Sequence, residues 1–227
     1  MRQVLCILLL LTALAGVAAG DPMLTINRVS GYYSGDGGAF TIVSAALSNA
    51  EYSPSPEKTK DIGTTGSFQS FCIEQTEHVT IPGNYYFTLD TCAVQGGAGG
   101  GSPDPLGYAT AWLYTQFATG VLSGYNYGAE RTTSAAALQN AIWYLEDEIA
   151  PVSGQANTWV IAANAAVSSG DWGNTIGDVR ILNLYKYDSE GNKVDCQSQL
   201  YLVPVPGAVL LGMLGLGAAG MKLRRAV

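Results

Sequence analysis

The stretch Ala137-Leu-Gln-Asn-Ala-Ile-Trp-Tyr-Leu-Glu146, read together with the distant segment Ser70-Phe-Cys-Ile-Glu74, organises the rest of this chain. Apolar residues recur at helical spacing through and beyond the first stretch, and Pro151 follows it. This pattern predicts an amphipathic helix over about residues 133–149 that ends before the proline. The second segment belongs to an alternating run and predicts a strand.

The predicted strand places Cys72 on one face and Phe71 on the other, because successive side chains of a strand alternate. Gln139 lies beside the apolar stripe of the predicted helix, where a neighbouring strand could reach its carboxamide. A thiolate held against a carboxamide carbonyl can displace ammonia, since a positioned pair reacts as though at very high concentration. The product would be a thioester, whose acyl group an incoming amine or hydroxyl can capture covalently.

The motif Phe71-Cys-Ile, followed by Gln139-x-Ala-Ile-Trp143, resembles the thioester domains of bacterial surface adhesins. The resemblance covers roughly Cys72 to Glu148, and it implies that Cys72 supplies the sulfur and Gln139 the acyl carbon. Phe71 flanks the cysteine and Trp143 lies one helical turn from Gln139, so we expect both to shield the site from water. The alternative interpretation is that Phe71 and Trp143 are core residues, Cys72 a small buried hydrophobe and Gln139 a helix-surface residue.

The rest of the chain predicts an α+β fold, with an antiparallel β-rich sheet or barrel and an inserted segment of about three helices. Alternating segments bounded by turn residues predict strands over residues 24–33, 39–45, 67–74, 84–90, 179–187 and 193–203. Helical spacing predicts one helix between Pro105 and Gly120, the helix over residues 133–149, and a third over residues 155–168.

Two other segments invite a ligand-binding interpretation but have simpler ones. Gly96–Ser102 is rich in glycine without the setting of a phosphate-binding loop, so it predicts a flexible linker. Glu146-Asp-Glu148 lacks the ligand spacing of a calcium loop and predicts a solvated helix end. Because the sequence also offers no zinc spacing and no catalytic triad, we expect no metal, no cofactor and no enzymatic turnover.

Residues 1–20 have a basic start, an apolar run and small residues before Asp21, which is typical of a secretory signal peptide. Export would leave Cys72, Cys92 and Cys196, an odd number, in an oxidising compartment. A disulfide between Cys92 and Cys196 would leave Cys72 for the thioester. Pairing of Cys72 with Cys92 or with Cys196 stays open, and either pairing would abolish the thioester.

Charge excludes one class of partner. All 18 acidic residues lie between Asp21 and Val203, together with 7 of the 11 basic residues, which gives that part of the chain a net charge of −11. Nucleic acid is therefore not an expected partner, because phosphate binding needs a basic face. Residues 21–203 are of a size typical of one domain with its own core.

The C-terminal segment, residues 204–227, has three parts. Pro204 and Pro206 precede an apolar, glycine-rich run, and Lys222, Arg224 and Arg225 follow it. This arrangement resembles the PEP-CTERM sorting signal, which implies an exosortase-type processing enzyme as a partner. The run predicts a hydrophobic transmembrane helix that holds the protein in the membrane before processing, with residues 21–203 outside. A plain C-terminal membrane anchor is the alternative.

Together these features predict an exported protein of the cell envelope, cell surface or extracellular matrix of Gram-negative-type bacteria. Its domain is expected to attach covalently, through the Cys72–Gln139 thioester, to amines or hydroxyls on a surface protein or polysaccharide. The alternative is a non-catalytic structural or glycan-binding module of a biofilm matrix, in which tyrosines and tryptophans provide stacking surfaces.

Overall fold

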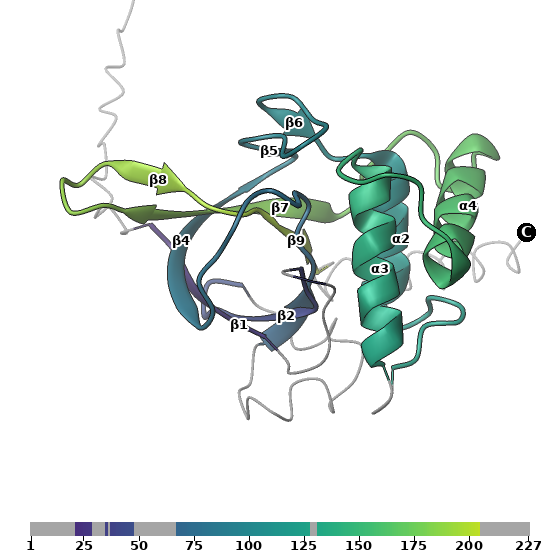
Figure 1. The fold of residues 1–227 in the computed structure, drawn as a ribbon, viewed down its shortest axis with the longest axis horizontal. Helices are drawn as coiled ribbons and strands as arrows, with labels where there is room; N and C mark the ends of the chain where they lie inside the picture. The colour runs from purple at the N-terminus through teal and green to yellow at the C-terminus, as the bar shows by residue number, and fades with distance from the viewer. Residues whose placement is uncertain (1–20, 29–34, 36, 48–66, 128–130, 205–227) are drawn as a thin grey trace, which may run out of the picture.

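The predicted α+β class is confirmed by a computed structural model that describes residues 21–28, 35, 37–47, 67–127 and 131–204. An antiparallel sheet curls into a nearly closed barrel, and the helices stand together on one side of it (Figure 1). The described elements are β1 (Met23–Arg28), β2 (Phe40–Val43), β3 (Ser67–Ser70), β4 (Gly83–Asp90), β5 (Cys92–Ala93), β6 (Asp104–Pro105), α2 (Tyr108–Ala118), α3 (Thr132–Leu145), α4 (Gly154–Ser168), β7 (Val179–Tyr187), β8 (Lys193–Asp195) and β9 (Gln199–Leu202).

The barrel is closed at the position of the candidate nucleophile. The strands follow the order β3-β2-β1-β4-β7, and β9 lies on the other side of β7. An isolated antiparallel bridge between Cys72 and Gln199 then joins the end of this sheet back to its beginning. Backbone hydrogen bonds on either side of Cys72 complete the seam, from Leu200 N to Phe71 O at 3.0 Å and from Ile73 N to Ser198 O at 3.3 Å.

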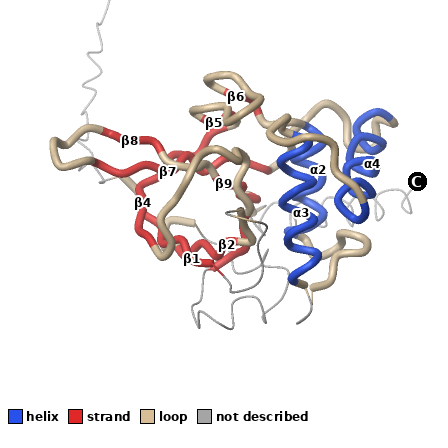
Figure 2. Tube along the Cα trace, in the orientation of Figure 1, coloured by secondary structure: helices blue, strands red, loops and turns tan. Residues whose placement is uncertain are grey.

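Two apolar cores lie on the two faces of this sheet, as the alternation of the sequence predicts. Cys72 belongs to the core inside the barrel, which also contains the largely aliphatic and aromatic inward side chains Leu24, Ile26, Phe40, Ile42, Phe68, Tyr85, Phe87, Leu184 and Tyr201. Phe71 and Ile73 belong to the second core, between the barrel and the helices. Figure 2 shows α2 and α3 beside the barrel and α4 on their far side, away from it. The strand that carries Cys72 is therefore covered on both faces.

The last predicted strand, residues 193–203, is interrupted in the structure. β8 pairs with the outer end of β7 and projects from the barrel on the side away from the helices, while β9 pairs with the inner part (Figure 1). The break falls where the backbone turns to contact the segment after Cys72. Gln197 Nε2 donates hydrogen bonds to the backbone oxygens of Glu74 and Glu77, at 3.2 Å and 2.6 Å. These tertiary hydrogen bonds compete with continued strand pairing.

Helix α3 ends at Leu145, four residues before the predicted end at Ile149. Asp147 takes a positive φ of 59°, which reverses the chain direction. Glu146 and Glu148 on either side of it are buried, so the predicted solvated helix end is wrong. Glu146 accepts a hydrogen bond from the backbone N–H of Gly107, at 3.3 Å from Oε1.

The glycine-rich segment Gly96–Ser102 is not a free linker, because it wraps around the carboxylate of Glu148. Ala98 N donates to Glu148 Oε1 at 2.8 Å and Gly99 N donates at 3.1 Å. On the other side of the carboxylate, Gln75 N donates to Oε2 at 2.7 Å. The glycines permit this close approach, since a Cβ at Gly97 would lie 2.3 Å from Glu148 Oε2.

The predicted signal peptide lies outside the described residues, as do the loop over residues 48–66 and all of the predicted sorting signal except Pro204. Within the described part of the chain, no helix has the length and apolar character needed to cross a membrane.

Candidate thioester site

The carboxamide of Gln139 lies between the two chains just beyond the end of the β2–β3 ladder. That ladder ends at the pair Phe40 and Ser70, so in the same register Ala39 would face Phe71 and Gly38 would face Cys72. Gln139 instead projects from α3 between them. Its Oε1 accepts hydrogen bonds from Gly38 N at 2.9 Å and Cys72 N at 3.3 Å, and its Nε2 donates to Cys72 O at 2.8 Å. A carboxamide offers the same donor and acceptor as a peptide group, so it replaces the missing strand partner.

This arrangement brings the two predicted thioester residues into contact. The Cys72 sulfur lies 3.4 Å from Gln139 Oε1, and both side chains are fully buried. The orientation of the carboxamide is determined by its partners, because two backbone N–H donors must face the oxygen and not the NH₂ group. Of the predicted site residues, Cys72 and Gln139 are therefore those that the fold places together most closely.

The two N–H groups on Gln139 Oε1 have the arrangement of an oxyanion hole. Attack of sulfur on the carbonyl carbon would move negative charge onto Oε1, where the N–H groups of Gly38 and Cys72 already point. Backbone donors fixed before the reaction stabilise such a charge without reorganisation. The site thus brings a thiol, a carboxamide and two backbone N–H donors into one buried contact.

Gly37 and Gly38 belong to the site, although they lie in the segment between two predicted strands, residues 24–33 and 39–45. A Cβ at Gly37 would lie 2.7 Å from both Gln139 Cγ and Trp143 Cη2, closer than carbon atoms can approach. Gly38 supplies the shorter of the two hydrogen bonds to Oε1. The Gly37-Gly38 pair directly before a strand was the available signal, because consecutive glycines often mark a close approach of backbone to another group.

The two predicted shielding residues have different positions. Trp143 is 5 % exposed and belongs to the barrel core with Cys72, so it covers the sulfur side of the strand. Phe71 lies on the opposite face, where its ring meets the ring of Phe117 edge to face at a centroid distance of 5.1 Å. The predicted shielding by Phe71 is therefore wrong. Phe71 packs against α2, because alternation along the strand directs its side chain away from the sulfur.

The environment of Cys72 favours the neutral thiol. Burial raises the pKa of Cys72 well above its ordinary value, and the negative charge of Glu74 raises it further. The N–H of Gly38 and the indole of Trp143 act in the opposite direction. The Trp143 indole nitrogen is buried and lacks hydrogen-bond geometry to any partner among the described residues, although it lies beside the sulfur. Reaction of the thiol therefore needs a group that removes its proton.

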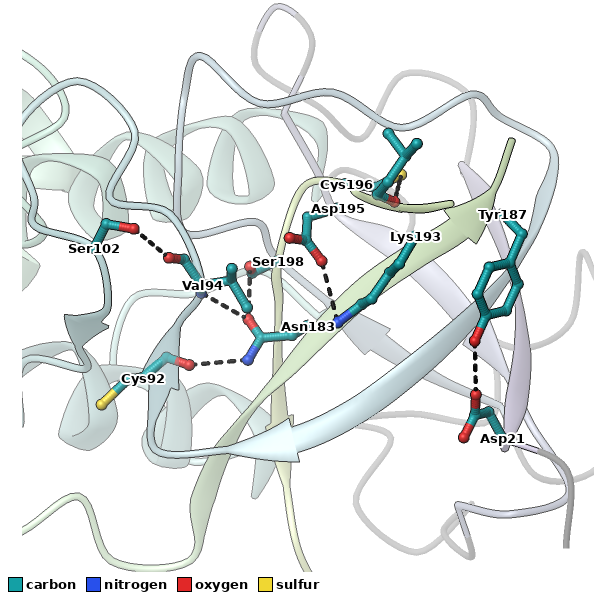
Figure 3. A network of polar contacts seen from close by, with 11 residues as sticks. Asp21, Cys92, Val94, Ser102, Asn183, Tyr187, Lys193, Asp195, Cys196 and Ser198 are labelled. Atoms are coloured by element: carbon teal, nitrogen blue, oxygen red, sulfur yellow. Dashed lines mark hydrogen bonds and ion pairs between the residues drawn. The ribbon is translucent and has the colours of Figure 1, made fainter. Parts of the chain in front are cut away.

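The predicted disulfide between Cys92 and Cys196 is not formed in the structure, where Cys72, Cys92 and Cys196 are all free thiols. Cys92 is held beside Asn183, whose Nδ2 donates to Cys92 O at 3.0 Å, whereas Cys196 N donates to Leu184 O at 2.8 Å. Figure 3 shows the Cys92 and Cys196 side chains pointing away from each other, with Asn183 between them. The two alternative pairings with Cys72 are likewise not formed.

Comparisons with protein-family models, with curated proteins and with solved structures return no match. Among the residues that the structure describes, no group of three or more His, Cys, Asp or Glu side chains is arranged to hold a metal ion.

Proposed function

We propose that this protein is an exported surface or matrix protein that attaches covalently to its partner through an internal thioester between Cys72 and Gln139. One observation carries the proposal: the Cys72 sulfur lies 3.4 Å from a Gln139 oxygen that also accepts two backbone N–H groups. The same two N–H groups would stabilise negative charge on Oε1 during attack by the sulfur.

The reaction proceeds in two steps. In the first, the Cys72 sulfur attacks the carbonyl carbon of Gln139, a C–S bond forms, the C–N bond breaks and ammonia leaves. In the second, an amine or hydroxyl of the partner attacks the same carbon and the Cys72 thiolate leaves, which produces an amide or ester to Gln139. Each domain reacts with its partner once, so the protein is a covalent adhesin and not a turnover enzyme.

A thioester must remain intact until the partner arrives, and the burial of the site suits this requirement. Cys72 and Gln139 are 0 % exposed, and Trp143, which is 5 % exposed, belongs to the same core as Cys72. Exclusion of water protects a reactive acyl group from hydrolysis. The partner must displace the Trp143 side chain, or the backbone at Gly37 and Gly38, to reach the acyl carbon.

Export and sorting belong to the same proposal. The signal-peptide pattern of residues 1–20 supports secretion, and the three-part pattern of residues 204–227 supports transient membrane anchoring followed by processing by an exosortase-type enzyme. A covalent attachment site is useful outside the cell, where partners are diluted and non-covalent complexes dissociate.

The intact mass of the purified protein, before and after treatment with methylamine, tests the proposal. We expect the untreated protein to be lighter than its sequence by one ammonia, and the treated protein to carry one methylamine. A Cys72→Ala variant should show the full mass and no adduct. A full mass for the wild-type protein, with no methylamine adduct, would overturn the thioester.

A glycan-binding module is the second candidate, and a cluster of tyrosines in which Tyr187 is exposed favours it. The Tyr86 ring stacks on Tyr185 at 5.6 Å, and Tyr187, which is 48 % exposed, meets Tyr86 edge to face at 5.4 Å. Exposed aromatic rings are the usual stacking surface for sugar rings. Retention of polysaccharide binding by Cys72→Ala, together with its loss in Tyr187→Ala, would support this function.

A further inference from the structure

A cavity of about 440 Å³ lies where β1 ends, at one mouth of the barrel. The described residues that line it are Arg28, His78, Val79, Ile81 and Gln197. His78 is exposed, so the cavity reaches the surface of the molecule. Small-molecule sites commonly have this size, and the mouth of a β-barrel is one of their usual places. The chemistry of the lining therefore indicates what the cavity can accept.

Arg28 is the last residue of β1, and it continues the inward face of that strand. Leu24 and Ile26 belong to the core inside the barrel, and side chains two residues apart on a strand share a face. Arg28 also pairs with Phe40 of β2, and its guanidinium carbon lies 5.4 Å from the centre of the Phe40 ring. A guanidinium over an aromatic face keeps N–H groups at its edge, where a carboxylate can accept two parallel hydrogen bonds.

The segment between β3 and β4 provides another wall, and it crosses the barrel in the view of Figure 1. Val79 and Ile81 of this segment pack against the barrel core. Gln197 holds the same segment in place, because its Nε2 donates to Glu77 O at 2.6 Å and its backbone N–H donates to His78 O at 3.4 Å. This wall is fixed by the protein's own contacts, so a ligand would not have to order it.

The charges of the lining favour an anion. Arg28 is basic, and no carboxylate is among the described residues that line the cavity. Glu77, the acidic residue next to His78, lines a different cavity beside the glycine-rich segment. The part of the chain between Asp21 and Val203 carries a net charge of −11, so a cavity with a basic lining is distinct from the surrounding charge. A negatively charged group would meet attraction here.

The remaining lining suits a sugar ring. Val79 and Ile81 are half-buried aliphatic residues, and His78 adds an imidazole that can hydrogen-bond hydroxyls. A sugar has C–H groups on its faces for the aliphatic side chains and hydroxyls at its edge for the imidazole. Apolar walls with a few polar groups are the usual composition of a small-molecule site.

We propose that this cavity binds an acidic sugar, whose carboxylate pairs with Arg28 while its ring packs on Val79 and Ile81. Binding here is non-covalent and goes beyond the proposed thioester, because neither Cys72 nor Gln139 lines the cavity. The site also differs from the tyrosine cluster around Tyr187, which has no part in this lining. Discrimination between an acidic and a neutral sugar is its distinguishing property.

Calorimetric titration of the full chain with galacturonic acid and with galactose, at one ionic strength, tests the proposal. The two sugars differ by a carboxylate in place of a hydroxymethyl group. We expect galacturonic acid to bind about tenfold to a hundredfold more tightly than galactose, the usual contribution of hydrogen bonds to a charged group. Undetectable binding of galacturonic acid, or an equal affinity for galactose or acetate, would overturn the proposal. Tighter binding of polygalacturonate than of the monomer would assign the site to a polysaccharide, and equal binding to a free sugar acid.

Arg28→Gln should weaken binding of galacturonic acid by the same factor. Arg180→Gln is the matched control, because it removes the same charge from a side chain that hydrogen-bonds the backbone oxygens of Gly177 and Val179 and does not line the cavity. It should bind like the wild type. An unchanged affinity in Arg28→Gln, or an equal loss in Arg180→Gln, would contradict the site.

His78→Glu keeps the proposal testable if Arg28→Gln fails to fold. His78 is exposed, so the substitution should preserve the fold while it adds a carboxylate to the wall of the cavity. Repulsion between like charges should weaken binding at least about tenfold. An unchanged affinity would overturn the site. Cys72→Ala and Tyr187→Ala should bind like the wild type, and loss of binding in either would move the ligand to another part of the molecule.

Discussion

Gln139 has two roles with one carboxamide: it replaces a strand partner of Cys72, and it is the proposed acyl donor. The hydrogen bonds that give the first role also align the second, because Gly38 N and Cys72 N hold Oε1 where an oxyanion would form. A side chain that lies beside the apolar stripe of α3 is thereby buried as completely as the stripe itself. The site therefore depends on which single residues allow their atoms to approach the carboxamide of Gln139.

Substitution of Gly37 tests how closely the backbone must approach the side chain of Gln139. A Gly37→Ala substitution would place a methyl group 2.7 Å from Gln139 Cγ and 2.7 Å from Trp143 Cη2. We expect a loss of about 1–3 kcal/mol in the free energy of unfolding, the usual cost of overpacking, and a lower yield of thioester. Urea unfolding measures the first and intact mass the second.

Gly101→Ala is the matched control, since a Cβ there meets its nearest neighbour, Pro103 O, at an ordinary 3.4 Å. It should leave both the free energy of unfolding and the thioester yield close to wild type. A Gly37→Ala protein with unchanged stability and unchanged yield would show that Gln139 and Trp143 move aside freely.

At the scale of the elements, the end of α3 connects three loops through its acidic residues. Glu148 receives backbone N–H groups from Gln75 and from the glycine-rich segment, and Glu146 receives one from Gly107. Gln75 follows the Cys72 segment directly. The carboxylate of Glu148 therefore fixes the position of the nucleophile's segment relative to the helix that carries the electrophile.

Glu148→Gln should loosen this connection. The amide keeps one oxygen for the N–H donors but presents an NH₂ group to the others, so we expect a loss of about 1–3 kcal/mol in the free energy of unfolding. Faster hydrogen exchange at Ala98 and Gly99 should accompany it. Asp147→Asn is the control, because it removes a neighbouring charge at an exposed residue whose positive φ asparagine also tolerates. Equal effects of both substitutions would attribute the loss to net charge alone.

At the scale of the whole molecule, several buried carboxyl groups act on stability in the same direction. Burial is the main cause that raises the pKa of Glu146 to about 7, of Glu74 to about 8 and of Glu77 to about 7. The folded protein therefore holds protons that the unfolded chain releases at lower pH. The stability linked to these groups is fully present below their unfolded pKa and is lost as pH rises through the folded values.

We expect the free energy of unfolding to fall as pH rises from about 5 to about 8, with Glu146 alone contributing about 1–3 kcal/mol of the change. Urea denaturation across this range measures it. Glu146→Gln, which stays neutral at every pH, should flatten part of the curve. A wild-type protein whose stability is constant or rises over the same range would contradict the assignment.

The sequence by itself determined the α+β class, most element boundaries, and the separation of Cys72 from Phe71 across the strand. These follow from local periodicity, because period two and period 3.6 are properties of the backbone. A short motif predicted the pairing of Cys72 with Gln139, and the fold brings the two side chains into contact.

Only the tertiary structure decided what surrounds that contact. Gly38 enters the site because the β2–β3 ladder ends at Phe40 and Ser70, which leaves the Gly38 N–H for Gln139, and Gln199 lies opposite Cys72 because their bridge joins the two ends of the sheet. The predicted Cys92–Cys196 disulfide is not formed, because Asn183 of β7 hydrogen-bonds Cys92 and Leu184 of β7 hydrogen-bonds Cys196. The two cysteine side chains point apart. Local patterns specify which face a side chain takes, but pairing between distant segments depends on the register of the closed sheet, which is set by the packing of the whole chain.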